Sequence, residues 1–352
     1  MAKRASTIVG LEIEPSGIHA ASVTVNGRVE VRHAAVAPLE TGIVRDGEVN
    51  DVDALTEALR SLYREHKNLD KKVRIGVANQ KIVVRVLELP PLEDAKELEA
   101  AVRFSAQDQI PMPLDSAVLD FQPLGIVETE SGARQRVLIV AARRDMVDRV
   151  LAACRGAGLK PEGIDLSAFA MIRALHRPTS SEAPEPVLYL SVGGLTNLAV
   201  AEGTTCLFTR VVGGGLEAIA VELAERKALT LEHARGWLRH VGLVTPLDEI
   251  ESDDQDEIVE EARTVLLDGV RRIGGEVRNS LDFPHAQEGM SLRVQRAVLT
   301  GAAATVPGFD DALAAELGLP VEAGMVTGTP DGLDPHLLTV AAGLAVEEAP
   351  NA

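Results

Sequence analysis

The chain has 352 residues, of which 46% are apolar and 25% charged, as is usual for a globular protein of more than one domain. Its 53 acidic and 35 basic residues give a formal net charge of −18, which would repel nucleic acid and anionic membranes, so we expect no nucleic-acid partner. No apolar run approaches the ~20 residues of a membrane helix. The start of the sequence does not resemble a signal peptide. We therefore expect a cytoplasmic protein without direct membrane insertion.

The first part of the chain alternates strand-like and helical patterns. Residues 6–40 alternate apolar and polar side chains, with a hairpin turn predicted at Asn26-Gly27. The leucines in 51–66 share one helical face, and two strands are predicted within 72–90. A helix is then predicted from about Glu93 to Gln109.

The same order of elements returns later. Residues 134–159 read as a strand and a helix, and the Pro/Ser-rich segment 176–187 reads as a linker. Residues 187–215 then repeat the opening pattern of strand, glycine loop, strand, turn and strand. A long helix over 257–283 and a strand, loop, helix and strand over 296–324 complete the pattern. This repeated order predicts a duplicated fold.

Turns of small residues follow three of the predicted strands, at 12–19, 191–197 and 301–304. Such turns allow backbone N–H groups to approach a phosphate closely, because no side chain blocks the approach. A further glycine run, 213–215, follows a strand of the second half. Three turns in this order predict a two-lobed site with a nucleotide between the lobes.

The stretch 83–125 is similar to the PilM family, the actin-like proteins of type IV pilus assembly. The features that carry this resemblance are a predicted strand, a predicted helix, the turn "IPMPL" and the segment "LDFQPLG". The segments "GLKPEGIDLSAFAMIRAL" (158–175) and "EVRNSLDFP" (276–284) also resemble this family. The resemblance extends over nearly the whole chain.

The resemblance implies an actin-like α/β fold of two lobes, each a ribonuclease-H-like domain, with a small subdomain inserted in the first lobe. We expect four parts, which in this numbering are as follows. The first lobe comprises 1–81, 161–184 and 336–352; the inserted, partner-binding subdomain 82–160; the second lobe 185–225 and 286–335; and a helical subdomain 226–285.

The resemblance also implies a site for ATP and Mg²⁺, but the nucleotide motifs depart from the family pattern. Where the family has D-x-G in its first loop, this chain has Glu12 and Glu14, and His19 stands near the expected lysine. Ser191 replaces the acid of the second loop, and Thr300-Gly301-Ala302 stands for S-G-G in the third. The candidate nucleotide-binding residues are Glu12, Glu14, Ser16, Gly17, His19, Ser191, Gly193, Gly194, Thr196, Asn197, Gly213, Gly214, Gly215, Gly301, Ala302 and Ala303.

A carboxylate about 4 Å from a phosphate costs about 4 kcal/mol at an effective dielectric constant near 20, so Glu14 opposes nucleotide binding. We therefore predict a degenerate site that is not an active ATPase. Glu12 is the residue that would hold Mg²⁺ if a metal binds.

The resemblance further implies a scaffold at the inner face of the cell membrane. Its partners would be the N-terminal cytoplasmic tail of a PilN-like inner-membrane protein and the pilus motor ATPases. The strand within 81–90, rich in β-branched residues, could accept the tail by strand addition. Two alternatives stay open: an active actin-like ATPase that binds Mg·ATP, and an FtsA-type cell-division protein. The second ranks lower, because that type carries a C-terminal amphipathic helix and this sequence ends "GLAVEEAPNA".

Overall fold

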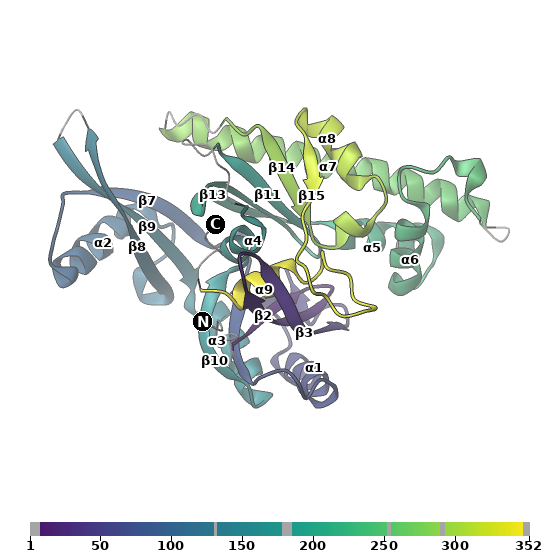
Figure 1. Ribbon diagram of the computed structural model, residues 1–352, viewed down its shortest axis with the longest axis horizontal. Coiled ribbons are helices and arrows are strands. Elements are labelled where there is room, and N and C mark those ends of the chain that lie inside the picture. Colours follow the sequence, from purple (N-terminus) through teal and green to yellow (C-terminus); the bar gives the residue numbers. More distant parts are fainter. Residues whose placement is uncertain (1–7, 130–131, 178–184, 252–254, 289–292, 348–352) are drawn as a thin grey trace.

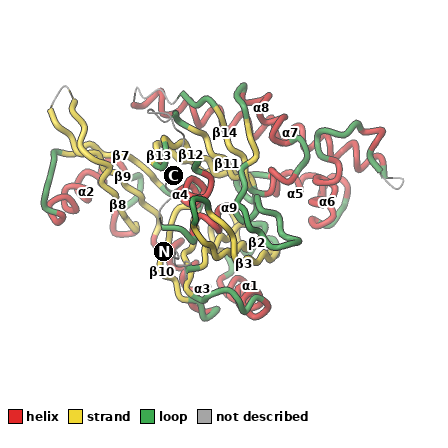
Figure 2. Tube along the Cα trace, viewed as in Figure 1, coloured by secondary structure: helices red, strands yellow, loops and turns green. Residues whose placement is uncertain are grey.

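The computed structural model describes residues 8–129, 132–177, 185–251, 255–288 and 293–347, with only the backbone given for 283–288. The chain forms two lobes, each built on a mixed sheet (Figures 1 and 2). The sheets have the strand orders β10-β6-β1-β2-β3 and β13-β12-β11-β14-β15. In each, the first strand pairs antiparallel with the second and parallel with a later one. The two-lobed α/β fold with repeated strand order that the sequence predicts is confirmed.

The first lobe contains the N-terminal strands and helices α1, α3, α4 and α9. Its elements are β1 Val9–Glu14, β2 Gly17–Val25, β3 Val29–Pro38, β4 Val44–Arg45, β5 Glu48–Val49, α1 Val52–Glu65, β6 Lys72–Val77, α3 Arg144–Gly156, β10 Lys160–Leu166, α4 Ser167–Leu175 and α9 Thr339–Leu344. Helix α1 begins after Asp51, whose side chain caps it by accepting a hydrogen bond from the Ala54 amide at 2.9 Å. Helices α1 and α3 cover one face of the sheet with a shared apolar core.

In the second lobe, helices α5 and α6 lie on the side away from the β7-β9-β8 sheet (Figure 1). Its elements are β11 Val187–Val192, β12 Thr196–Glu202, β13 Thr205–Val212, α5 Leu216–Lys227, α6 Leu231–Val241, η2 Leu247–Glu249, α7 Asp256–Glu288, β14 Arg296–Thr300, η3 Ala302–Thr305, α8 Phe309–Leu317 and β15 Val321–Ala323. Every residue of β11 is buried. One large core joins this sheet to α5, α6, α7 and α8.

Helices α4 and α9 lie between the two sheets and pack against each other. Helix α9 lies on β1 and β2, whereas α4 also contacts β11 and β12 of the second lobe. Two glycines permit this close packing: a Cβ on Gly10 would collide with the carbonyl oxygen of Ala341, and a Cβ on Gly343 with that of Ala170. The lobes therefore meet through a tightly packed pair of helices.

A separate sheet extends to one side of the lobes in Figure 1. It has the order β7-β9-β8 and carries one helix; its elements are β7 Val83–Leu89, α2 Ala95–Gln109, η1 Leu114–Ser116, β8 Ala117–Thr129 and β9 Gly132–Arg143. We call these residues, 83–143, the arm. Its core lies between α2 and one face of the sheet, with Val102, Val137 and Ile139 completely buried. The next helix, α3, packs against α1 of the first lobe.

In the described ranges, no helix is both long enough and apolar enough to span a membrane.

Candidate functional site

The turns that end β1 and β11 meet between the lobes. The β1–β2 turn carries Glu14 and Pro15, and the β11–β12 turn carries Gly193 and Gly194. The amide of Gly194 donates a hydrogen bond to Glu14 Oε2 at 3.2 Å. An added Cβ on Gly194 would lie 2.7 Å from Cδ of Pro15. The sequence-predicted loops of the two lobes are thus in direct contact.

The Glu14 carboxyl fills the space over the second loop. A Cβ on Gly193 would lie 2.5 Å from Glu14 Oε2, so only glycine leaves room for this carboxyl. The Ser16 hydroxyl donates to the same oxygen at 3.5 Å. Burial and then the charge of Glu12 raise the pKa of Glu14 to about 7, although His19, the Gly194 amide and Ser16 act in the opposite direction.

Glu12 and His19 form a buried pair on the adjacent strands β1 and β2. Glu12 Oε2 lies 3.1 Å from His19 Nδ1, and the residues are 5% and 6% exposed. Burial alone lowers the pKa of His19, but the hydrogen bond and charge of Glu12, with the charge of Glu14, raise it above its usual value. Glu12, the residue that would hold Mg²⁺, is therefore already hydrogen-bonded to His19.

The third loop lies against the second at Ser191. A Cβ on Gly301, which has φ +81°, would lie 3.0 Å from Ser191 Oγ. Ala303 belongs to the buried core of the second lobe, and Ala302 packs partly against that core. Both alanines therefore have packing roles, whereas Gly301 permits the close approach of the loops.

Some of the other predicted residues lie at the site, and others only contact the surrounding fold. Thr196 Oγ1 donates to the Gly214 carbonyl at 2.9 Å, which ties the 213–215 run to the second hairpin. Asn197 is buried, and its Oδ1 has no hydrogen-bond partner among the described protein atoms. Gly17 faces β3 instead, because a Cβ there would lie 2.7 Å from the Ala37 carbonyl oxygen.

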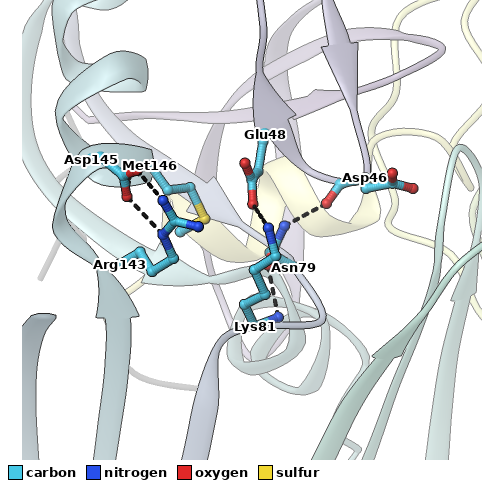
Figure 3. Close-up of polar contacts among 7 residues, drawn as sticks. All are labelled: Asp46, Glu48, Asn79, Lys81, Arg143, Asp145 and Met146. Atoms are coloured by element: carbon cyan, nitrogen blue, oxygen red, sulfur yellow. Dashed lines mark hydrogen bonds and ion pairs between the residues drawn. The ribbon is translucent and has the colours of Figure 1, made fainter. Parts of the chain in front are cut away.

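Gln80 was not predicted to be a site residue, although its side chain reaches the glycine run 213–215 from the first lobe. Its Nε2 would lie 2.8 Å from a Cβ on Gly213. Gln80 also lines a polar hollow of about 240 Å³ beside the β4–β5 hairpin. Figure 3 shows how that hairpin is held: Asn79 Nδ2 donates to the Asp46 carbonyl at 2.6 Å, and Lys81 pairs with Glu48 at 2.8 Å. A glutamine after a strand gives no local signal of such a position.

The space where the second loop would face a phosphate holds a side chain in this structure. The amide that would face a phosphate, Gly194 N–H, is already bonded to Glu14, and the space above Gly193 is filled by the same carboxyl. Ser191 supplies no carboxylate. Among the described residues, no three His, Cys, Asp or Glu side chains are grouped as metal ligands. Glu14, Gly194 and Ser16 thus satisfy one another's hydrogen bonds in this structure.

A second feature is a groove between the arm and the lobes. It consists of two hollows of about 310 Å³ each that share lining residues of β8, β9 and α4. We call it the arm groove; its shared lining residues are Gln122, Leu138, Phe169 and Arg173. One hollow continues to β10, and the other reaches the β12–β13 turn of the second lobe at Thr204 and Thr205. The groove lies at β8. The strand predicted from the sequence to accept the partner's tail is β7, which forms the other edge of the arm sheet.

Comparison with known proteins identifies the chain's relatives. The family model of the type IV pilus assembly protein PilM matches residues 10–325. The chain belongs to the PilM family. This PilM-family chain is also similar to a solved structure described as the PilM-PilN type IV pilus biogenesis complex, with 26% identity and a TM-score of 0.75. That match covers 97% of this chain and 98% of the other.

More distant structures share the fold. The ethanolamine utilization protein EutJ from Carboxydothermus hydrogenoformans is 16% identical, with a TM-score of 0.53, and the match covers 96% of this chain and 88% of EutJ. MreB5 of Spiroplasma citri, solved with ADP, is 12% identical, with a TM-score of 0.54, and the match covers 96% and 94% of the two chains. At these identities the likeness shows the actin-like fold of the PilM-family chain and nothing of its ligands.

Proposed function

We propose that this PilM-family chain is a cytoplasmic scaffold of a type IV pilus assembly machine, peripheral at the inner face of the membrane. It holds the N-terminal cytoplasmic tail of a PilN-like inner-membrane protein and links it to the pilus motor ATPases. Its nucleotide site is degenerate. The family and the likeness to a PilM-PilN complex support the partner. The observation that carries the proposal is the arm groove.

The arm groove has the chemistry of a peptide site. Its floor is apolar, with Leu138 buried and Val118 and Val140 half-buried beside Phe169. Strand β8 is an edge of the arm sheet and β10 an edge of the first-lobe sheet, and both line the groove. An extended peptide can pair with such an edge through its backbone while alternate side chains enter the apolar hollows.

Charged groups lie at the same groove. Arg173 pairs with Asp165, and its Nε donates to the Gly343 carbonyl at 3.2 Å. Asp120 is exposed on β8. The paired Arg173 and the exposed Asp120 suit a tail that presents apolar side chains between polar or charged ones.

Two apolar residues of β8, one leucine and one isoleucine, provide a matched test of peptide binding. Leu124 is half-buried and lines the groove, whereas Ile126 is 61% exposed and outside its lining. Leu124→Glu should weaken binding of a synthetic peptide of the PilN-like protein's cytoplasmic N-terminus by about 10-fold or more, because a lost apolar contact costs about 1.5–3 kcal/mol. Ile126→Glu should leave the dissociation constant unchanged. Calorimetry measures both; equal affinities of the two variants would place the peptide elsewhere.

A further inference from the structure

Glu14 makes the contact that a phosphate oxygen makes in a glycine loop. A glycine turn binds an anion by pointing backbone N–H groups into a space that no side chain occupies. Here the space is above Gly193, the N–H group is that of Gly194, and the anion is a carboxyl from the other lobe. Glu14 and Gly194 are 180 residues apart in the sequence.

We propose that the Glu14 carboxyl is an internal ligand of the second glycine loop, which holds the two lobes together in place of a nucleotide. This inference rests on the degenerate site proposed above and deepens it, because it names what occupies that site. Pro15 adds a packing contact to Gly194 beside the hydrogen bond. The two hairpin turns are thus joined by one polar and one apolar contact.

The internal ligand excludes the external one. A phosphate bound to the Gly194 amide would need the space that the Glu14 carboxyl fills above Gly193. Where that carboxyl is ionised, the two negative groups also repel each other. Moving the carboxyl aside would also break its bonds to Gly194 and Ser16. We expect wild type to bind Mg·ATP about 30-fold more weakly than a variant without this carboxyl, which corresponds to about 2 kcal/mol.

Amide hydrogen exchange of the purified chain tests the internal ligand directly. In wild type, the segment 193–195 should exchange slowly, because the Gly194 amide is bonded to Glu14. Glu14→Ala should raise its exchange rate about 10-fold or more. Glu14→Gln keeps an acceptor oxygen and should retain most of the protection. Glu40→Ala, at an exposed acid of the same lobe, is the control and should change nothing.

Gly193→Ala disrupts the same contact from the second lobe, and it serves as a second variant if Glu14→Ala does not fold. Gly193 is not among the positive-φ glycines, so alanine is compatible with its backbone, but the new Cβ would displace the Glu14 carboxyl. The same loss of protection is expected. Unchanged exchange in both Glu14→Ala and Gly193→Ala would overturn the internal ligand.

The degenerate site itself is tested separately by calorimetry with Mg·ATP. Wild type that binds as tightly as Glu14→Ala would refute the degenerate site, whatever the exchange data show. Weak binding by wild type, with unprotected 193–195, would refute the internal ligand alone. Weak binding, together with protection that depends on Glu14, supports both proposals.

Discussion

His19 Nδ1 lies 3.1 Å from Glu12 Oε2, and both side chains are almost completely buried between the hairpin strands of the first lobe. A buried charged pair is sensitive to the loss of either partner, because the remaining charge is left without compensation. His19→Leu should therefore lower the free energy of unfolding by about 3 kcal/mol. Urea unfolding at neutral pH measures this change.

The double variant Glu12→Gln/His19→Leu is the control for that prediction. It removes both charges, so it should lose less stability than His19→Leu alone. If the double variant is the less stable of the two, the pair carries no buried ionic coupling.

The pH dependence of stability should report the buried state of Glu14. Its pKa is raised to about 7 in the folded protein, so the folded state retains a proton that the unfolded state has lost. The stabilisation is present at pH below the unfolded pKa and is lost as pH rises through the folded pKa. Between about pH 4.5 and 7, the free energy of unfolding should fall by up to about 3 kcal/mol from this group.

The neighbouring titratable groups are Glu12 and His19, and the loop of the second lobe that contacts Glu14 contributes only the Gly194 amide. The raised pKa of His19 acts with the same sign, because stability from a protonated histidine is also lost as pH rises. Glu14→Gln isolates the glutamate. The free energy of unfolding of this variant minus that of wild type should be larger at pH 8 than at pH 5. A difference that does not change with pH contradicts the prediction.

Two glycines should respond in opposite ways to alanine. A Cβ on Gly343 would collide with the Ala170 carbonyl between α9 and α4, whereas a Cβ on Gly275 in α7 meets nothing within 4 Å. Gly343→Ala should destabilise by about 1–3 kcal/mol or more through overpacking. Gly275→Ala should stabilise by roughly 0.5–1 kcal/mol, because it removes a flexible residue from a helix. Thermal unfolding of both variants measures the contrast; a Gly343→Ala variant as stable as wild type would mean that α4 and α9 can move apart there.

The order of the elements could be read from the sequence because it depends on local patterns. The alternation in 6–40 and 187–215 predicted the two hairpins, and the shared face of the leucines in 51–66 predicted α1. The Glu14 contact to Gly194 could not be found in this way, because it joins residues of different lobes. Likewise, no local pattern in the sequence of α4 shows that Phe169 lines a groove with β8 of the arm.

If Glu14 closes the nucleotide site, the site should reopen when that residue and the missing acid are both restored. Glu14→Gly removes the carboxyl above Gly193 and its repulsion of a phosphate, of order 1–4 kcal/mol. Ser191→Asp supplies a carboxylate beside the third loop, where Gly301 approaches Ser191. Glu12 cannot replace it while it is paired with His19. The double variant should therefore bind Mg·ATP more tightly than either single variant.

A thermal shift series with and without Mg·ATP measures this for wild type, both single variants and the double variant. A ligand that binds only the folded state stabilises it by about 2.7 kcal/mol at a concentration of 100 times its dissociation constant. At saturating Mg·ATP the double variant should thus melt several degrees higher, and wild type should scarcely change. Wild type that already shifts fully, with no gain from Glu14→Gly, would show that a nucleotide displaces the Glu14 carboxyl at little cost. The contact between Glu14 and Gly194 would then be one state of an open site.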